Sequence, residues 1–100
     1  MMKVFISQPM GDRSDEVIIA ERNAIEKELN RVISDDDVVI VDSFFRQSPH
    51  HANPLWFLGK SLELLSTADA AYFADHWNEH RGCKIEHDAC KYYNIKILHD

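Results

Sequence analysis

Short apolar segments recur four times along the chain, and stretches with helical periodicity separate them. The second and third segments are apolar at every position, which is typical of strands that are buried on both faces in a parallel sheet. The segments span residues 4–6, 38–41, 70–74 and 95–98. We therefore predict four short strands that alternate with helices.

The first helix is predicted over residues 15–32. Ser14 is a suitable N-cap, and Asp15 and Glu16 fall in the first turn, where the helix dipole favours acidic side chains. One face of this helix is expected to pack against the sheet. The apolar stripe on that face comprises Val17, Ile18, Ala24, Ile25, Leu29 and Val32.

Two further helices have clear start or stop signals. The second begins with Asn53 as the cap and Pro54 at the first helical position, and Gly59 falls on its apolar face. A glycine in a helix costs about 1 kcal/mol relative to alanine, so we expect another backbone to approach closely there. The third helix is predicted over 82–93, and Asn94 is expected to end it. The apolar face of the second helix comprises Leu55, Leu58, Leu62 and Leu65.

Strand–helix alternation with right-handed crossovers predicts an α/β fold. We expect an open, doubly wound parallel sheet of about four strands, in a flavodoxin-like or Rossmann-like three-layer sandwich. The chain has 100 residues, the size of a single domain spanning 1–100. Ligands of such sheets bind beyond the carboxyl ends of the strands. Three loops are expected there, at residues 7–13, 42–53 and 75–81.

Glu86 is the residue with the strongest functional signal. It shares a face of the third predicted helix with Cys83, Ala89, Cys90 and Tyr93, which are small or apolar. A carboxylate on a packing face is costly unless something satisfies or uses it. The helix dipole would help to keep it ionised, and an ionised, partly desolvated carboxylate suits a nucleophile. The alternative is a Glu that is hydrogen-bonded to a neighbouring loop or tilted to the rim.

Composition and charge restrict the partners. The formal net charge of −6, with no basic stripe, argues against a nucleic acid polymer. The N-terminus, residues 1–6, has no long apolar stretch, so we expect neither a signal peptide nor a membrane span. Cys83 and Cys90 would lie about 10 Å apart on one helix, too far for a disulfide, so reduced thiols and a cytoplasmic setting are expected. Arg13 is a candidate contact for a phosphate, and Arg22 is a second that we expect to be exposed.

Two motifs give the chain a resemblance to a known family. Residues 2–10 (MKVFISQPM) and the spacing of Trp77, Gly82, Glu86 and His87 resemble the nucleoside 2-deoxyribosyltransferase-like superfamily. Within it, the chain is most similar to a group of small phage and bacterial domains of unknown function. The resemblance implies that Glu86 attacks the anomeric carbon of a nucleoside or nucleotide and displaces the base, which another base or water then replaces. It implies no cofactor and no metal.

The resemblance also implies a set of substrate contacts. The loop after the first strand would hold the sugar or its 5′ phosphate, with backbone N–H groups near Gly11 as donors. Trp77 either stacks on the base or caps the core. The residues expected to bind substrate are Phe5, Gln8, Pro9, Met10, Gly11, Asp42, Ser61, Trp77 and Gly82.

The chain departs from the family pattern at four positions. Phe5 stands where relatives have a tyrosine that positions the nucleophile, and Gln8 stands where they have glycine. Ser61 occupies the place of an aspartate, and His80 that of another. His80 is a candidate proton donor to the leaving base, because imidazole exchanges protons near neutral pH. The alternative for His80 is a solvated loop residue.

Other groups of residues have alternative interpretations. Cys83, His87 and Cys90 have a spacing that could present three metal ligands, although both thiols can equally pack as small apolar residues. The His50–His51 pair in the long loop suits a lid, a subunit contact or plain surface. Asp42 and Ser43 either touch a ligand hydroxyl or serve a turn.

Association of identical chains is also expected. A four-stranded sheet leaves its edges uncovered, and Phe44 and Phe45 are expected to be exposed aromatic residues suited to an interface. For function, the first hypothesis is an enzyme acting on N-glycosidic bonds. The alternatives are a nucleotide-binding module that has lost turnover, and a structural or phage-accessory protein with a vestigial cleft.

Overall fold

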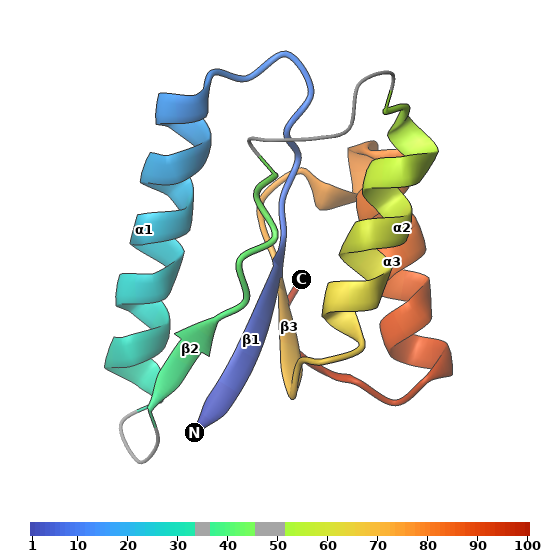
Figure 1. Ribbon diagram of the computed structural model, residues 1–100. Coiled ribbons are helices and arrows are strands. Elements are labelled where there is room, and N and C mark those ends of the chain that lie inside the picture. Colours follow the sequence, from blue (N-terminus) through green and yellow to red (C-terminus); the bar gives the residue numbers. More distant parts are fainter. Residues whose placement is uncertain (34–36, 46–51) are drawn as a thin grey trace.

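Helix α1 covers one face of a four-stranded parallel sheet, and helices α2 and α3 cover the other (Figure 1). This three-layer α/β sandwich confirms the predicted fold class. The computed structural model describes residues 1–33, 37–45 and 52–100. The elements are β1 (Met2–Ser7), α1 (Asp15–Val32), β2 (Val38–Ile40), α2 (Pro54–Leu65), β3 (Ala70–Phe73), the 3₁₀ turn η1 (Trp77–Glu79), α3 (Arg81–Tyr92) and β4 (Lys96–His99).

The strand order is β2-β1-β3-β4, and every neighbouring pair is parallel. Val4 of β1 lies in register with Ile40 on one side and with Ala70 on the other. The chain therefore moves outward from β1 to the edge strand β2, and then crosses β1 to reach β3. This reversal places α1 and α2 on opposite faces and opens a crevice at the carboxyl ends of β1 and β3, where ligands of such sheets bind.

Alternation along β1 divides the core in two. Val4 and Ile6 point toward α1 and pack in one buried cluster with Ile25 and Leu29. Phe5 points to the other face, where its cluster includes residues of both α2 and α3. Because side chains alternate along a strand, Ser7 shares the face of Phe5. The members of this second cluster are Phe5, Leu65, Ala71, Phe73 and Cys90.

Local signals fixed both ends of α1 and the start of α2 where we expected them, whereas α3 begins and ends one residue earlier than predicted. The Ser14 hydroxyl accepts a hydrogen bond from the Val17 amide, and the Asn53 side chain accepts one from the Trp56 amide. Asn94, the expected stop of α3, adopts a left-handed conformation with φ of 60° just beyond the helix. Capping side chains and a left-handed residue satisfy groups that the helix itself leaves unpaired.

The predicted stripe of α1 is too wide. Ile18, Ile25 and Leu29 are buried, but three other members of the stripe are exposed. Two of these lie one position before a buried residue, about 100° around the helix and away from the sheet. The third is the last residue of the helix. The exposed members are Val17, Ala24 and Val32.

Four other packing expectations are wrong. Val39 is exposed because β2 is an edge strand, not one buried on both faces. Leu55 is exposed in the first turn of α2, at the rim of the cavity described below. Tyr93 is exposed because it follows the last helical residue and its backbone leaves the helical path. Among the described residues, nothing lies within 4 Å of a side chain placed at Gly59, so none of their backbone approaches it, and nothing in the structure explains this glycine.

Candidate functional site

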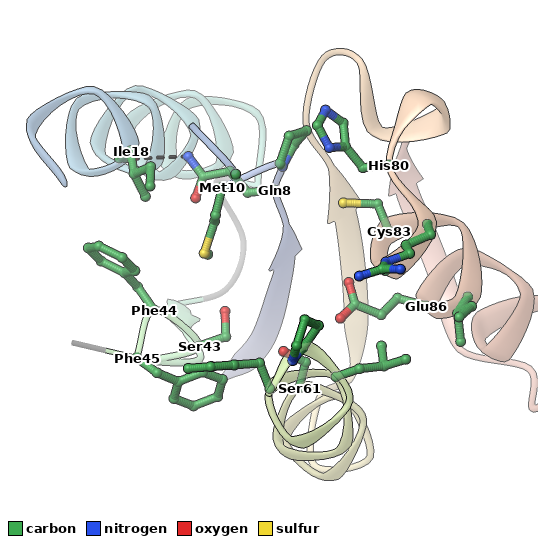
Figure 2. Close-up of a pocket in the computed structure, with 18 of the residues that line it drawn as sticks. Gln8, Met10, Ile18, Ser43, Phe44, Phe45, Ser61, His80, Cys83 and Glu86 are labelled. Atoms are coloured by element: carbon green, nitrogen blue, oxygen red, sulfur yellow. Dashed lines mark hydrogen bonds between the residues drawn. The ribbon is translucent and has the colours of Figure 1, made fainter. Parts of the chain in front are cut away.

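A cavity of ≈ 890 Å³ opens at the carboxyl end of the sheet (Figure 2). Its walls come from the end of β1 and the loop after it, the segment after β2, the first turns of α2 and the first turns of α3. The volume lies within the range of about 300–1,000 Å³ that is typical of small-molecule sites. The crevice predicted from the strand order is thus a real hollow. Its walls include residues 5–11, 43–45, 53–58 and 80–86, with gaps, as well as Ser61.

Glu86 lies on the wall that α3 contributes. Cys83, Glu86 and Cys90 are the buried residues of this helix, as their spacing predicted, and Cys90 packs in the Phe5 cluster beneath the sheet. The side of α3 that faces the sheet therefore continues into the cavity at Glu86, which is only 6% exposed. Figure 2 shows its carboxylate directed toward the hollow, beside Cys83.

Hydroxyl groups satisfy the buried carboxyl. The Ser7 Oγ donates a hydrogen bond of 2.7 Å to Glu86 Oε1, and Ser61 also hydrogen-bonds this side chain. Burial nevertheless raises the pKa of Glu86 to about 7. The two hydroxyl groups lower this pKa, but their combined effect is smaller than that of desolvation. The expectation that the helix dipole keeps this group ionised is therefore only half right: near pH 7 the neutral and charged forms are both populated.

Cys83 lies beside Glu86 but is not a competing nucleophile. Burial, together with a smaller effect of the neighbouring Glu86 carboxylate, raises the pKa of this thiol to about 11. A thiol with such a pKa stays protonated at neutral pH, and the thiolate is the reactive form. Glu86 is therefore the better candidate for nucleophilic chemistry in this wall.

Ser7 is a site residue that sequence reasoning missed. It is 1% exposed and it holds the Glu86 carboxyl from the end of β1. The sequence did contain a signal for Ser7. This serine is two residues after Phe5, so it points to the same α2–α3 face of the sheet, and it is the first polar residue after the apolar run.

The loop after β1 enters the cavity, but its residues differ in role. Pro9, Met10 and Gly11 line the hollow. Gln8 also lines it, yet its Nε2 is used within the protein, donating to the Ile18 carbonyl at 3.0 Å (Figure 2). The same nitrogen donates to a Glu21 side chain that also pairs with an arginine of the loop. Gln8 thus ties the loop to α1.

Arg22 connects the segments that follow β1 and β2. Its guanidinium donates to the Gln8 side chain at 3.3 Å, to the Val41 carbonyl at 3.1 Å and to the Ser43 hydroxyl at 3.2 Å. Burial lowers the pKa of Arg22, against an opposite effect of Asp42. The expectation that Arg22 is an exposed helix residue is wrong. Ser43, for which the sequence left a ligand contact and a turn as alternatives, lines the cavity and is 3% exposed.

The structure gathers most of the predicted site residues around one hollow. Ser61 enters from α2, and His80 and Gly82 enter from the start of α3. Arg81, also at the start of α3, adds a positive charge to the same wall. The predicted residues that line the cavity are Phe5, Gln8, Pro9, Met10, Gly11, Ser61, His80, Gly82 and Glu86.

Two predicted contacts lie elsewhere. Trp77 does not line this cavity: its ring stacks on His87 with centroids 4.1 Å apart and packs against Phe73, so it caps the core. His87 follows Glu86 in the chain and therefore points about 100° away from it, where it also contacts Asp100 at 3.0 Å. Asp42 is exposed and lines a separate hollow next to α1.

The alternative interpretations of other residues are also resolved in part. Phe44 and Phe45 are half-buried in the cavity wall, not exposed as expected. Across residues 1–33, 37–45 and 52–100, no cluster of three or more His, Cys, Asp or Glu side chains is arranged to hold a metal ion. Both cysteines are free and buried. The paired histidines 50 and 51 fall outside the described residues.

No helix in the described part of the chain combines the length and the apolar character needed to cross a bilayer. Comparison of the sequence and structure with models of protein families, with curated proteins and with solved structures gives no match. The functional argument therefore depends on the site itself.

Proposed function

We propose that the protein cleaves or exchanges the N-glycosidic bond of a nucleoside or nucleotide, with Glu86 as the nucleophile. The observation that carries this proposal is a carboxyl group that is 6% exposed, held by the Ser7 hydroxyl and open to a cavity of ligand size. A buried acid with a raised pKa in a cleft is a recurrent feature of functional sites.

The reaction proceeds in two displacements. A Glu86 carboxylate oxygen forms a bond to C1′ of the sugar as the bond from C1′ to the base nitrogen breaks, and that nitrogen takes the electron pair and a proton. His80, at the same cavity, supplies the proton. Water or a second base then attacks C1′, gives its proton back to His80, and releases the Glu86 carboxylate.

The departures from the family pattern at Phe5 and Ser61 are compatible with this role. Phe5 is 1% exposed and belongs to the core, so it serves packing beneath the site. The hydroxyl that holds Glu86 comes instead from Ser7, two residues along the same strand face. Ser61 reaches the same carboxyl from α2. Two neutral donors thus take the place of a tyrosine and an aspartate, and a hydrogen bond to an ionised group contributes about 1.5–3 kcal/mol.

The test is release of free base. The protein is incubated with a panel of ribo- and deoxynucleosides and their monophosphates, and free base is measured by chromatography. Glu86→Gln should abolish release, whereas Glu79→Gln, a control at an exposed position of η1, should retain it. If Glu86→Gln releases base at the wild-type rate, or no substrate is cleaved, the proposal is wrong. Binding without base release would instead indicate a nucleotide-binding module.

Self-association and a cytoplasmic setting are part of the same proposal. Leu55, Tyr92 and Tyr93 are each more than 70% exposed, and such side chains are suited to contacts between copies. Strands β2 and β4 form the edges of the sheet. The two free thiols fit a reducing compartment. Light scattering at micromolar concentration tests association, and a monomer would contradict it.

A further inference from the structure

The cavity has two chemically different walls. On one side are the Glu86 carboxylate and Cys83, and on the other are Met10, Phe44 and Phe45 (Figure 2). Other hydrophobic residues also line the cavity, so the side of Met10, Phe44 and Phe45 offers apolar area for dispersion contacts. The further apolar lining residues are Ile18, Phe57 and Leu58.

The aromatic wall is held in place from behind. Phe45 packs against Trp56 and Phe57 of α2, with ring centroids 6.2 Å and 6.3 Å away. Ser43, just before the two phenylalanines, is 3% exposed and accepts a hydrogen bond of 3.2 Å from Arg22. Contacts to both α1 and α2 therefore fix this segment before any ligand arrives, which reduces the entropy lost on binding.

We propose that Met10, Phe44 and Phe45 bind the nucleobase and give the site a preference for purines. This inference rests on the proposed function. In a displacement at C1′, the incoming oxygen and the departing nitrogen lie on opposite sides of the carbon. With Glu86 at one wall, the base must extend toward the opposite wall, which is the aromatic one.

The purine preference follows from the character of that wall. Recognition by stacking and apolar burial increases with the area of the ring system, and it is tolerant of hydrogen-bonding pattern. Within the described part of the lining, Ser43 directly precedes the two phenylalanines, and its buried hydroxyl is already bound by Arg22. A purine covers more of the wall than a pyrimidine, and we expect it to bind roughly fivefold more tightly or better.

Calorimetric titration of Glu86→Gln with deoxyadenosine, deoxyinosine, deoxycytidine and thymidine tests the preference without turnover. Phe44→Leu and Phe45→Leu are then added separately to Glu86→Gln, and each should weaken purine binding about tenfold or more. Two positions are used because Phe45 also packs against α2, and circular dichroism verifies the fold. Tyr92→Leu, an aromatic change at a residue that is 79% exposed, is the matched control and should leave binding unchanged.

The outcomes separate this inference from the proposed function. Equal or tighter binding of pyrimidines, unchanged binding in both phenylalanine variants, or no binding of any nucleoside would overturn the inference. A preference for purines, together with weaker purine binding in both phenylalanine variants, supports the inference. If that preference is found but the wild-type protein releases no base, the proposed function fails and the base-binding wall stands. If base is released from purines and pyrimidines with equal KM, the inference alone fails.

Discussion

Replacing Glu86 by glutamine should change how the stability of the protein depends on pH. Burial raises the pKa of Glu86 from 4.5 to about 7 in the folded protein. Between these two values the folded state holds a proton that the unfolded state has released, so stability falls as pH rises. The contribution of this proton is complete below pH 4.5 and is lost as pH rises through 7.

The size of the effect follows from the separation of the two pKa values. A separation of about 2.5 is equivalent to about 3 kcal/mol. This is a large part of the 5–15 kcal/mol by which domains are usually stable. Glutamine at position 86 has nearly the same shape and no titrating proton. The free energy of unfolding of Glu86→Gln, relative to the wild type, should therefore rise by about 3 kcal/mol between pH 4 and pH 8.

Urea denaturation at steps across this pH range, followed by far-UV circular dichroism, measures the difference. Histidines titrate in the same range, but they are present in both proteins and cancel in the comparison. Asp88→Asn removes an exposed carboxylate from the same helix, and its curve should stay parallel to that of the wild type. If the Glu86→Gln curve is also parallel to it, the pKa of Glu86 is the same in the folded and unfolded states and the argument from desolvation is wrong.

Four further substitutions test other parts of the structure. Ser7→Ala removes the 2.7 Å donor to Glu86, raises the pKa of that carboxyl, and should shift the midpoint of the pH profile for base release upward by about one pH unit or more. Asn53→Ala removes the N-cap of α2 and should lower the free energy of unfolding by about 1 kcal/mol in urea titrations. Leu29→Ala should lower the free energy of unfolding by about 2–5 kcal/mol, because this side chain is 2% exposed. Val32→Ala should lower it by less than about 0.5 kcal/mol, because Val32 is 55% exposed, and equal losses would contradict the packing described for α1.

The elements of the fold were predictable because their signals are local. Ser14 and Asn53 cap the helices that they precede, and apolar runs mark all four strands. Exposure was less predictable, since it depends on which strands lie at the edges. Val39 belongs to a fully apolar run and is nevertheless 41% exposed on the edge strand β2. No property of the run itself distinguishes an edge strand from a central one.

The site was predictable where a residue conflicts with its surroundings. Glu86 is a carboxylate among small and apolar positions of one helix face, and it is buried at the cavity. Ser7 was overlooked, and Ser43 was left undecided, because serine at the end of a strand normally serves a turn. The expectation that Trp77 contacts substrate was wrong because the motif gives the number of residues between Trp77 and Glu86 but not the direction in which the Trp77 side chain points. Trp77 stacks on His87, which points away from the cavity.

The two states of Glu86 have different uses on the proposed reaction path. In the free protein, the protonated form avoids the cost of a buried charge, and Ser7 offsets only part of the desolvation. As the bond to the base breaks, positive charge develops on the sugar beside this carboxyl, and a nearby positive charge favours the ionised form. The interaction is then stronger in the transition state than in the ground state, which is the condition for faster catalysis. A neutral nucleoside bound at this carboxyl excludes water before that charge develops and should raise the pKa of Glu86 further, so that the pH midpoint of kcat, which reports the bound complex, lies above that of kcat/KM, and coincident midpoints would contradict this coupling.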